Sequence, residues 1–155
     1  MAEFQANSVT TVNPGEVLVF TENPVPCNRG LIRWREGSGN FLLSGYVPNI
    51  YGCGCSQSSS ANYLVDFGAN IAIPSTGTVG AISIAIAMDG TTIPASTMIV
   101  TPAAVEQYFN VSRAINADVW RGCCETLSIR NTSDQPILVQ NANLIITRPD
   151  LAITR

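Results

Sequence analysis

The sequence predicts an all-β fold in which two sheets pack face to face as a β-sandwich or jelly roll. Three observations lead to this class. Apolar residues alternate with small or polar residues along several segments, Gly, Pro, Asn and Ser separate those segments at short intervals, and no heptad or longer repeat is visible. Alternation at every second position is the pattern of a half-buried strand, and many short strands with frequent turns are typical of sandwiches and jelly rolls.

Two segments show the alternation most clearly. From Tyr63 to Ile73 every odd-numbered position is apolar, while the other face carries residues such as Asp66 and Asn70. From Ile82 to Met88 the even-numbered positions are large and apolar, and the odd-numbered ones are Ser or Ala. We expect the large face to fill the core of the sandwich. The small face is expected to lie against another backbone, of the same chain or of a neighbouring subunit.

The remaining strands are expected where shorter alternating runs lie between turn residues. Asp89-Gly90 predicts a tight turn into a returning strand, and the Gly-Ser-Gly-Asn sequence at 37–40 predicts a hairpin loop. The first 15 residues are polar and predict an extended arm, and 48–62 predicts an exposed loop. The further strands are expected at 16–21, 31–36, 40–45, 107–115, 125–131 and 136–148.

Composition limits the partners. The chain has 155 residues, enough for one domain with a sizeable core, but only 12% of them are charged against about 25% in a typical soluble domain. Surfaces so poor in charge are often covered by sister subunits. All eight basic residues are Arg, they form no cluster, and the net charge is −3, so we expect no nucleic-acid binding.

The sequence also bears on compartment and membrane contact. The sequence contains no stretch of about 18 apolar residues, so we expect no transmembrane helix and no membrane partner. The N-terminus shows no basic region followed by an apolar run of secretory length. We therefore expect synthesis in a bacterial cytoplasm.

The five cysteines leave three states open. Cys53, Cys55, Cys123 and Cys124 have the number of ligands that zinc takes, but a C-x-C and an adjacent pair do not match the C-x₂₋₄-C spacing of structural zinc sites. A disulfide between these two groups or between subunits is the second state. Free thiols are the third state and the simplest in a reducing compartment. With Cys27 the count is odd, so at least one of the five cysteines is unpaired within the chain.

Common catalytic arrangements are not supported by the residues present. The chain has no histidine, which excludes Ser-His-Asp and Cys-His chemistry. Its eleven acidic residues form no distinctive cluster. The carboxylates of Asp89, Asp118 and Asp134 have the chemistry to bind Ca²⁺, but Asp is also an ordinary turn residue, and we favour turns. We expect no enzymatic activity, no cofactor and no metal site.

Four stretches carry a resemblance to a family of phage-encoded virion proteins, which in turn resembles the compact trimeric jelly rolls of the C1q and tumour-necrosis-factor (TNF) class. The resemblance covers about residues 29–148 and implies a homotrimer. It leaves open whether the domain decorates a capsid or forms a head at a tail tip or fibre. The stretches are GLIRWREGSGNFLLSG, GANIAIPSTGTVGAISIAIAMDG, STMIVTPAAVEQYFNV and RGCCETLSIRNTSDQPILVQNANLIITR.

The resemblance and the missing stalk together favour capsid decoration. No collagen-like repeat or coiled coil precedes the domain, so residues 1–28 are expected to dock on the major capsid protein and 29–155 to form the trimerisation domain. A receptor-binding head that recognises a host-surface glycan is the alternative. The expected docking residues are Phe4, Val9, Val12, Val17, Val19 and Phe20, and the expected trimer-interface residues are Ala85, Ala87, Tyr108, Phe109 and Ile146.

Overall fold

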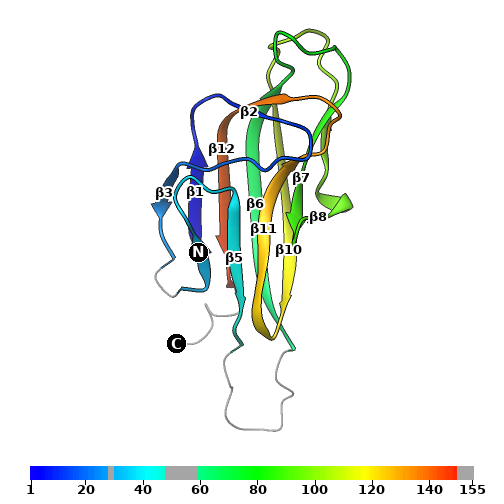
Figure 1. Cartoon of the computed structure of the whole chain (residues 1–155). Helices are drawn as coiled ribbons and strands as arrows, with labels where there is room; N and C mark the ends of the chain where they lie inside the picture. Colours follow the sequence, from blue (N-terminus) through cyan, green and yellow to red (C-terminus); the bar gives the residue numbers. More distant parts are fainter. Residues whose placement is uncertain (28–29, 48–58, 150–155) are drawn as a thin grey trace, which may run out of the picture.

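The computed structural model describes residues 1–27, 30–47 and 59–149, which form a sandwich of two antiparallel six-stranded sheets (Figure 1). The predicted all-β sandwich is confirmed. Sheet A contains, in order, β10 (Phe109–Trp120), β6 (Ser60–Ala72), β12 (Ile137–Thr147), β1 (Ala2–Ala6) and β3 (Glu22–Val25), and β2 (Thr10–Val12) also pairs with β12. Sheet B contains β4 (Ile32–Trp34), β5 (Asn40–Gly45), β11 (Gly122–Asn131), β7 (Ile82–Met88) and β8 (Thr91–Thr92), and β9 (Met98–Val100) also pairs with β7.

The two clearest sequence patterns became β6 and β7. Every odd-numbered side chain from Tyr63 to Ile73 is buried, as the alternation predicts, and so are Ile82, Ile84 and Ile86. The two strands lie in different sheets, and their apolar faces meet across the sandwich. Burying each large aliphatic or aromatic side chain contributes about 1.5–3 kcal/mol, so these two faces supply a large part of the core.

The predicted turn at Asp89-Gly90 is also present. Met88 pairs with Thr91, so Asp89 and Gly90 form a two-residue loop between β7 and β8. Both have positive φ, 49° at Asp89 and 81° at Gly90, which a type I′ turn requires at both positions. The Asp89 carboxylate accepts a hydrogen bond from the Thr126 backbone at 2.8 Å and so ties the turn to β11.

The polar arm expected for residues 1–15 is wrong for Ala2–Ala6, which form β1. β1 pairs along its length with β12 and on its other side with β3, and its side chains Ala2, Phe4 and Ala6 are buried. The Phe4 ring lies 4.5 Å from the ring of Phe41 in the opposite sheet, centroid to centroid. The N-terminus is therefore an integral strand of the sandwich.

Residues 16–21 do not form the expected strand. Val17 makes a single isolated bridge with Arg130, while the Leu18 backbone donates to the Ile129 carbonyl and the Phe20 backbone to the Ser38 carbonyl. The segment runs from β11 of sheet B, where Leu18 bonds, to β1 of sheet A, where the Thr21 backbone donates to the Gln5 carbonyl, so its backbone bonds are divided among several neighbours. Its alternation is real nevertheless, because Leu18 and Phe20 are fully buried.

No helix within the described segments combines the length and apolar character that crossing a membrane requires. The helical element η1 (Pro94–Ser96) is a single 3₁₀ turn. Its buried Ser96 hydroxyl contacts the backbone N and O of Ile86 at 2.9 and 3.1 Å, which holds the turn against β7.

Candidate interaction surfaces

The six residues expected to dock on a capsid divide into two groups. Phe4, Val12 and Phe20 are buried in the sandwich, with at most 2% of their surface exposed. Val9 and Val19 are 50% and 36% exposed, and Val17 is half-buried. A partner that binds the folded chain therefore finds only the second group accessible, because exposing the first would open the core.

The five residues expected at a trimer interface also divide. Tyr108 and Phe109 are 37% and 38% exposed, whereas Ala85, Ala87 and Ile146 have no exposed surface. Ile146 faces the core from β12. In the register, Ala85 lies opposite Arg130, and Ala87 lies between Ser128 and Thr92.

The small side chains of β7 therefore lie under larger neighbours of their own chain. The Arg130 guanidinium donates to the Gly15 carbonyl at 2.9 Å, which places this long side chain beside Ala85. A small residue in the middle of a sheet is easily covered in this way. Of the predicted interface residues, Tyr108 and Phe109 alone have surface to offer a neighbouring subunit, and the interface itself stays a prediction.

β10 is the most open strand of sheet A. Among the described strands it pairs with β6 alone and lies at the edge of the sheet, and its even-numbered side chains from Asn110 to Trp120 are all exposed. Large apolar side chains lie at both of its ends. Trp120 is 68% exposed and Leu64, on the adjacent β6, is 40% exposed. We call the following residues of the outward face the β10 surface: Leu64, Tyr108, Asn110, Ser112, Ala114, Asn116, Asp118 and Trp120.

Trp120 is not among the interface residues predicted from the sequence. The alternation of β10 contained the missing signal. Val111, Ala117 and Val119 are buried, so the even-numbered Trp120 must lie on the opposite face.

Polar groups on the outer face of sheet A bond to each other across strands. The Asn62 amide donates to the Asp118 carboxylate at 2.6 Å, and the Asn110 amide donates to the Asn70 side-chain oxygen at 3.3 Å. These are cross-strand neighbours in the register of β6 and β10. Asp118 therefore lies within a strand, where the sequence analysis had placed it in a turn.

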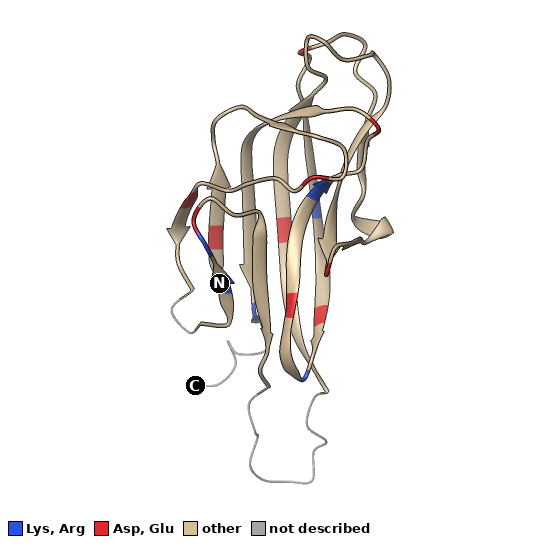
Figure 2. Ribbon diagram, in the orientation of Figure 1, with Lys and Arg blue, Asp and Glu red and all other residues tan. Residues whose placement is uncertain are grey.

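Charged residues are few and lie on strands of both sheets (Figure 2). The outward positions of β1, β6 and β10 carry Glu3, Asp66 and Asp118 and no basic residue. On sheet B, β4 carries Arg33 on its exposed face and β11 carries Arg130. Arg33 and Arg130 therefore place positive charge on sheet B.

Glu125, on β11, has a perturbed carboxyl group. Desolvation by burial raises the pKa of Glu125, and the negative charge of Asp89 raises it further. Both effects disfavour the ionised form. Among the described residues no three His, Cys, Asp or Glu side chains are grouped so that they could hold a metal ion.

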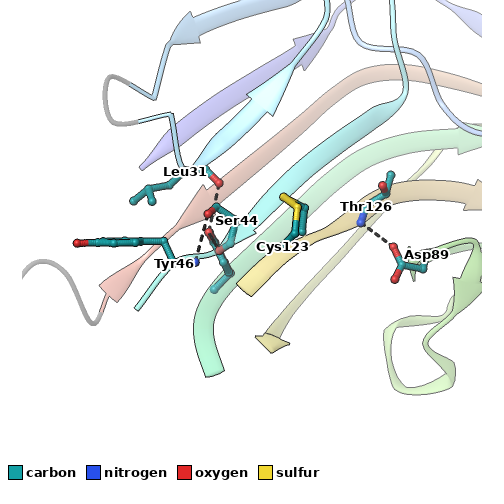
Figure 3. Close-up of a disulfide and its surroundings, with 8 residues drawn as sticks. Leu31, Ser44, Tyr46, Asp89, Cys123 and Thr126 are labelled. Atoms are coloured by element: carbon teal, nitrogen blue, oxygen red, sulfur yellow. Dashed lines mark hydrogen bonds between the residues drawn. A yellow bond between two sulfur atoms is a disulfide. The ribbon is translucent and has the colours of Figure 1, made fainter. Parts of the chain in front are cut away.

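Cys123 and Cys124 form a disulfide with each other, which was not among the states considered from the sequence. They lie where the pairing of β11 with β5 shifts register between Gly122 and Glu125. In Figure 3 the disulfide has Ser44 on one side and, on the other, the hydrogen bond that joins Thr126 to Asp89. Cys27 is half-buried against the core. Cys53 and Cys55, which the sequence analysis considered as zinc ligands or disulfide partners, lie outside the described residues.

Known structures with the same architecture identify the fold. The globular domain of a zebrafish complement 1qA protein is 11% identical, with a TM-score of 0.55, and the match covers 93% of this chain and 94% of that one. The Eiger TNF of S. frugiperda is 12% identical, with a TM-score of 0.61, over 95% of this chain and 90% of that one. The chain has the C1q/TNF-like jelly-roll fold.

No protein-family model matches the chain, and no curated protein matches it either. At this level of identity, structural likeness establishes the fold and leaves the function to be argued from surfaces.

Proposed function

We propose that this chain is a non-catalytic structural protein of a phage virion, a homotrimer that decorates the capsid and stabilises it. The sequence resemblance to phage virion proteins supports the virion assignment. The absence of histidine supports a role without Ser-His-Asp or Cys-His chemistry. In this role the protein is made in the bacterial cytoplasm and ends on the surface of the phage head.

The β10 surface is the observation that carries the trimer. A twelve-residue edge strand with large apolar side chains at both ends is an aggregation hazard unless something covers it. A closed ring of subunits covers it and leaves no open edge for further growth. Small side chains at Ser112 and Ala114 allow the neighbouring chain to approach closely.

Capsid binding then requires an exposed surface of the trimer and not a free arm. β1 is held between β12 and β3, so it cannot leave to add a strand to a capsid subunit. A trimer that contacts several capsid subunits at once gains avidity. Because it binds the assembled shell and not free subunits, it shifts the equilibrium towards the shell.

The first experiment is the mass of the native protein by light scattering, with and without reductant. We expect three times the 16.5 kDa chain in both conditions, because the Cys123–Cys124 disulfide lies within one chain. A monomer would contradict the homotrimer. A trimer that falls apart in reductant would contradict non-covalent assembly.

A second experiment tests the location in the virion. Quantitative mass spectrometry of purified particles gives the number of copies relative to the major capsid protein. Decoration predicts a copy number comparable to that of the capsid protein. A few copies per particle would favour the alternative, a receptor- or glycan-binding head.

A further inference from the structure

An open groove of about 400 Å³ lies on the outer face of sheet B. Arg33 of β4 and Thr126 of β11 both pair with Leu42 of β5, so these three side chains form one row across three strands. Arg35 lies two positions from Arg33 and therefore on the same face of the chain. The groove is lined by Arg33, Trp34, Arg35, Asn40, Leu42 and Thr126.

The two guanidinium groups of this groove have no partner in the described part of the chain. Arg33 and Arg35 are exposed, and neither makes a hydrogen bond or an ion pair with any residue that the structure describes. By contrast, Arg130 donates to Gly15 and Arg113 donates to the Thr97 carbonyl. Like charges at adjacent positions on one face repel each other, so an anion between them is stabilising.

The rest of the lining restricts what kind of anion fits. Leu42 is half-buried on this face, whereas the Trp34 ring packs towards the core, with its centroid 5.4 Å from that of Phe4. Leu42 gives the groove an apolar floor. The side-chain amide of Asn40 and the hydroxyl of Thr126, which bond to no described residue, add neutral polar groups at the rim.

We propose that this groove binds the carboxylate-bearing sugar unit of a glycan, such as a uronic or sialic acid. Arg forms paired hydrogen bonds with a carboxylate in its own plane. The apolar floor suits the C–H face of a sugar ring, and the amide and hydroxyl suit its hydroxyl groups. The volume is that of a small-ligand site.

The proposal does not depend on the homotrimer or on capsid docking, because all six lining residues belong to one chain. It gives the receptor-binding alternative a location and a ligand class. Failure of the groove would leave the β10 surface and the trimer untouched. Conversely, a monomeric protein would still be able to bind the sugar.

The test is calorimetric titration of the full chain with methyl glucuronide and with sialyllactose, each against its neutral counterpart, methyl glucoside or lactose. Loss of one charge-assisted pair weakens binding roughly 10- to 100-fold, so we expect at least that preference for one acidic sugar over its neutral counterpart. Arg33→Gln and Arg35→Gln should each cause a similar loss. Arg121→Gln, which removes an equal charge from the hairpin between β10 and β11, should leave the affinity within about twofold.

Two further arms separate a sugar site from a general anion site. Asn40→Ala should weaken the binding of the acidic sugar several-fold and leave the binding of inorganic phosphate unchanged. Equal binding of acidic and neutral sugars, or no binding of either, would overturn the proposal. Binding of phosphate or of an acidic peptide more tightly than the acidic sugar would also overturn it. So would a loss of affinity in Arg121→Gln equal to that in Arg33→Gln, because net charge alone would then explain the effect.

Discussion

β1 and β10 lie in the same sheet, but one is enclosed and the other is open. β1 has five residues from a polar N-terminus, and it lies between β12 and β3 with its apolar face against the aromatic rings of sheet B. β10 has twelve residues with aromatic rings at both ends, and it pairs with β6 alone. Phe4 is 1% exposed and Trp120 is 68% exposed.

The difference shows that burial follows the face on which a side chain lies more closely than the composition of its strand. Phe4 is buried because it faces sheet B, where its ring packs against Phe41. On β10, Val119 is likewise buried towards the core, whereas its neighbour Trp120 stays exposed on the outer face. The open strand is therefore where the chain has surface to give to a partner.

The largest expected effect is at β1. Phe4→Ala should lower the free energy of unfolding by about 3–5 kcal/mol, because it leaves a cavity beside Phe41 and Trp34 in a core that cannot fully relax. Urea denaturation measures the change. Gln5→Ala, on the outer face of the same strand, is the matched control and should cost less than about 1 kcal/mol. Equal effects of the two variants would mean that residues 1–6 are an arm after all.

A second prediction concerns assembly through β10. Ala114→Arg places a long charged side chain in the middle of the β10 surface, so the trimer should dissociate while the chain stays folded. Asp66 lies directly opposite Ala114 and can pair with the new charge. Light scattering should show one third of the native mass, with an unchanged circular dichroism spectrum.

Ile99→Arg is the control for this variant. Ile99 is 66% exposed on β9 in sheet B, so it takes the same charge on the other sheet. We expect the trimer to survive. If Ile99→Arg dissociates the trimer and Ala114→Arg does not, the interface lies on sheet B.

The parts of the fold that the sequence predicted are those whose pattern is complete within one segment. Residues 63–73 and 82–88 each contain enough alternating side chains to define a buried face, and Asp89-Gly90 defines its own turn. β1 was missed because Phe4 is its only large apolar residue. Its pairing with β12 is what makes it a strand, and that partner lies at the far end of the sequence.

The candidate surfaces were predictable only in part for a related reason. Alternation assigns side chains to faces, but it does not say whether another part of the same chain covers a face. Ala85 looked available for a subunit contact, yet Arg130 lies opposite it and reaches across to Gly15. The arginine groove requires the register of three strands, which no local pattern contains.

A smaller effect is expected from pH at Glu125, on the strand that follows β10. Its folded-state pKa is raised by desolvation and by Asp89, so the folded chain holds this proton more tightly than the unfolded chain does. Stability therefore falls as the pH rises from the ordinary carboxyl pKa through the raised one. Glu125→Gln removes this loss, so it should be more stable than the wild type near pH 7, and the gain should shrink towards the ordinary carboxyl pKa.

Thermal melts at a series of pH values measure this difference. A gain for Glu125→Gln that is the same at all pH values would contradict titration as the cause and would point to packing alone. A lower stability at neutral pH would mean that the ionised carboxylate has a stabilising partner.

The smallest expected effect completes the comparison of the two strands. Trp120→Ala removes a larger ring than Phe4→Ala does, but Trp120 is 68% exposed in the single chain. Measured in the Ala114→Arg background, where the chain is monomeric, it should change the free energy of unfolding by no more than about 0.5 kcal/mol. In the otherwise native chain the same substitution should weaken the trimer, which dilution followed by light scattering detects. A large destabilisation of the monomer would show that Trp120 packs within its own chain, and β10 would then lose one of its two apolar ends as a contact for a neighbouring subunit.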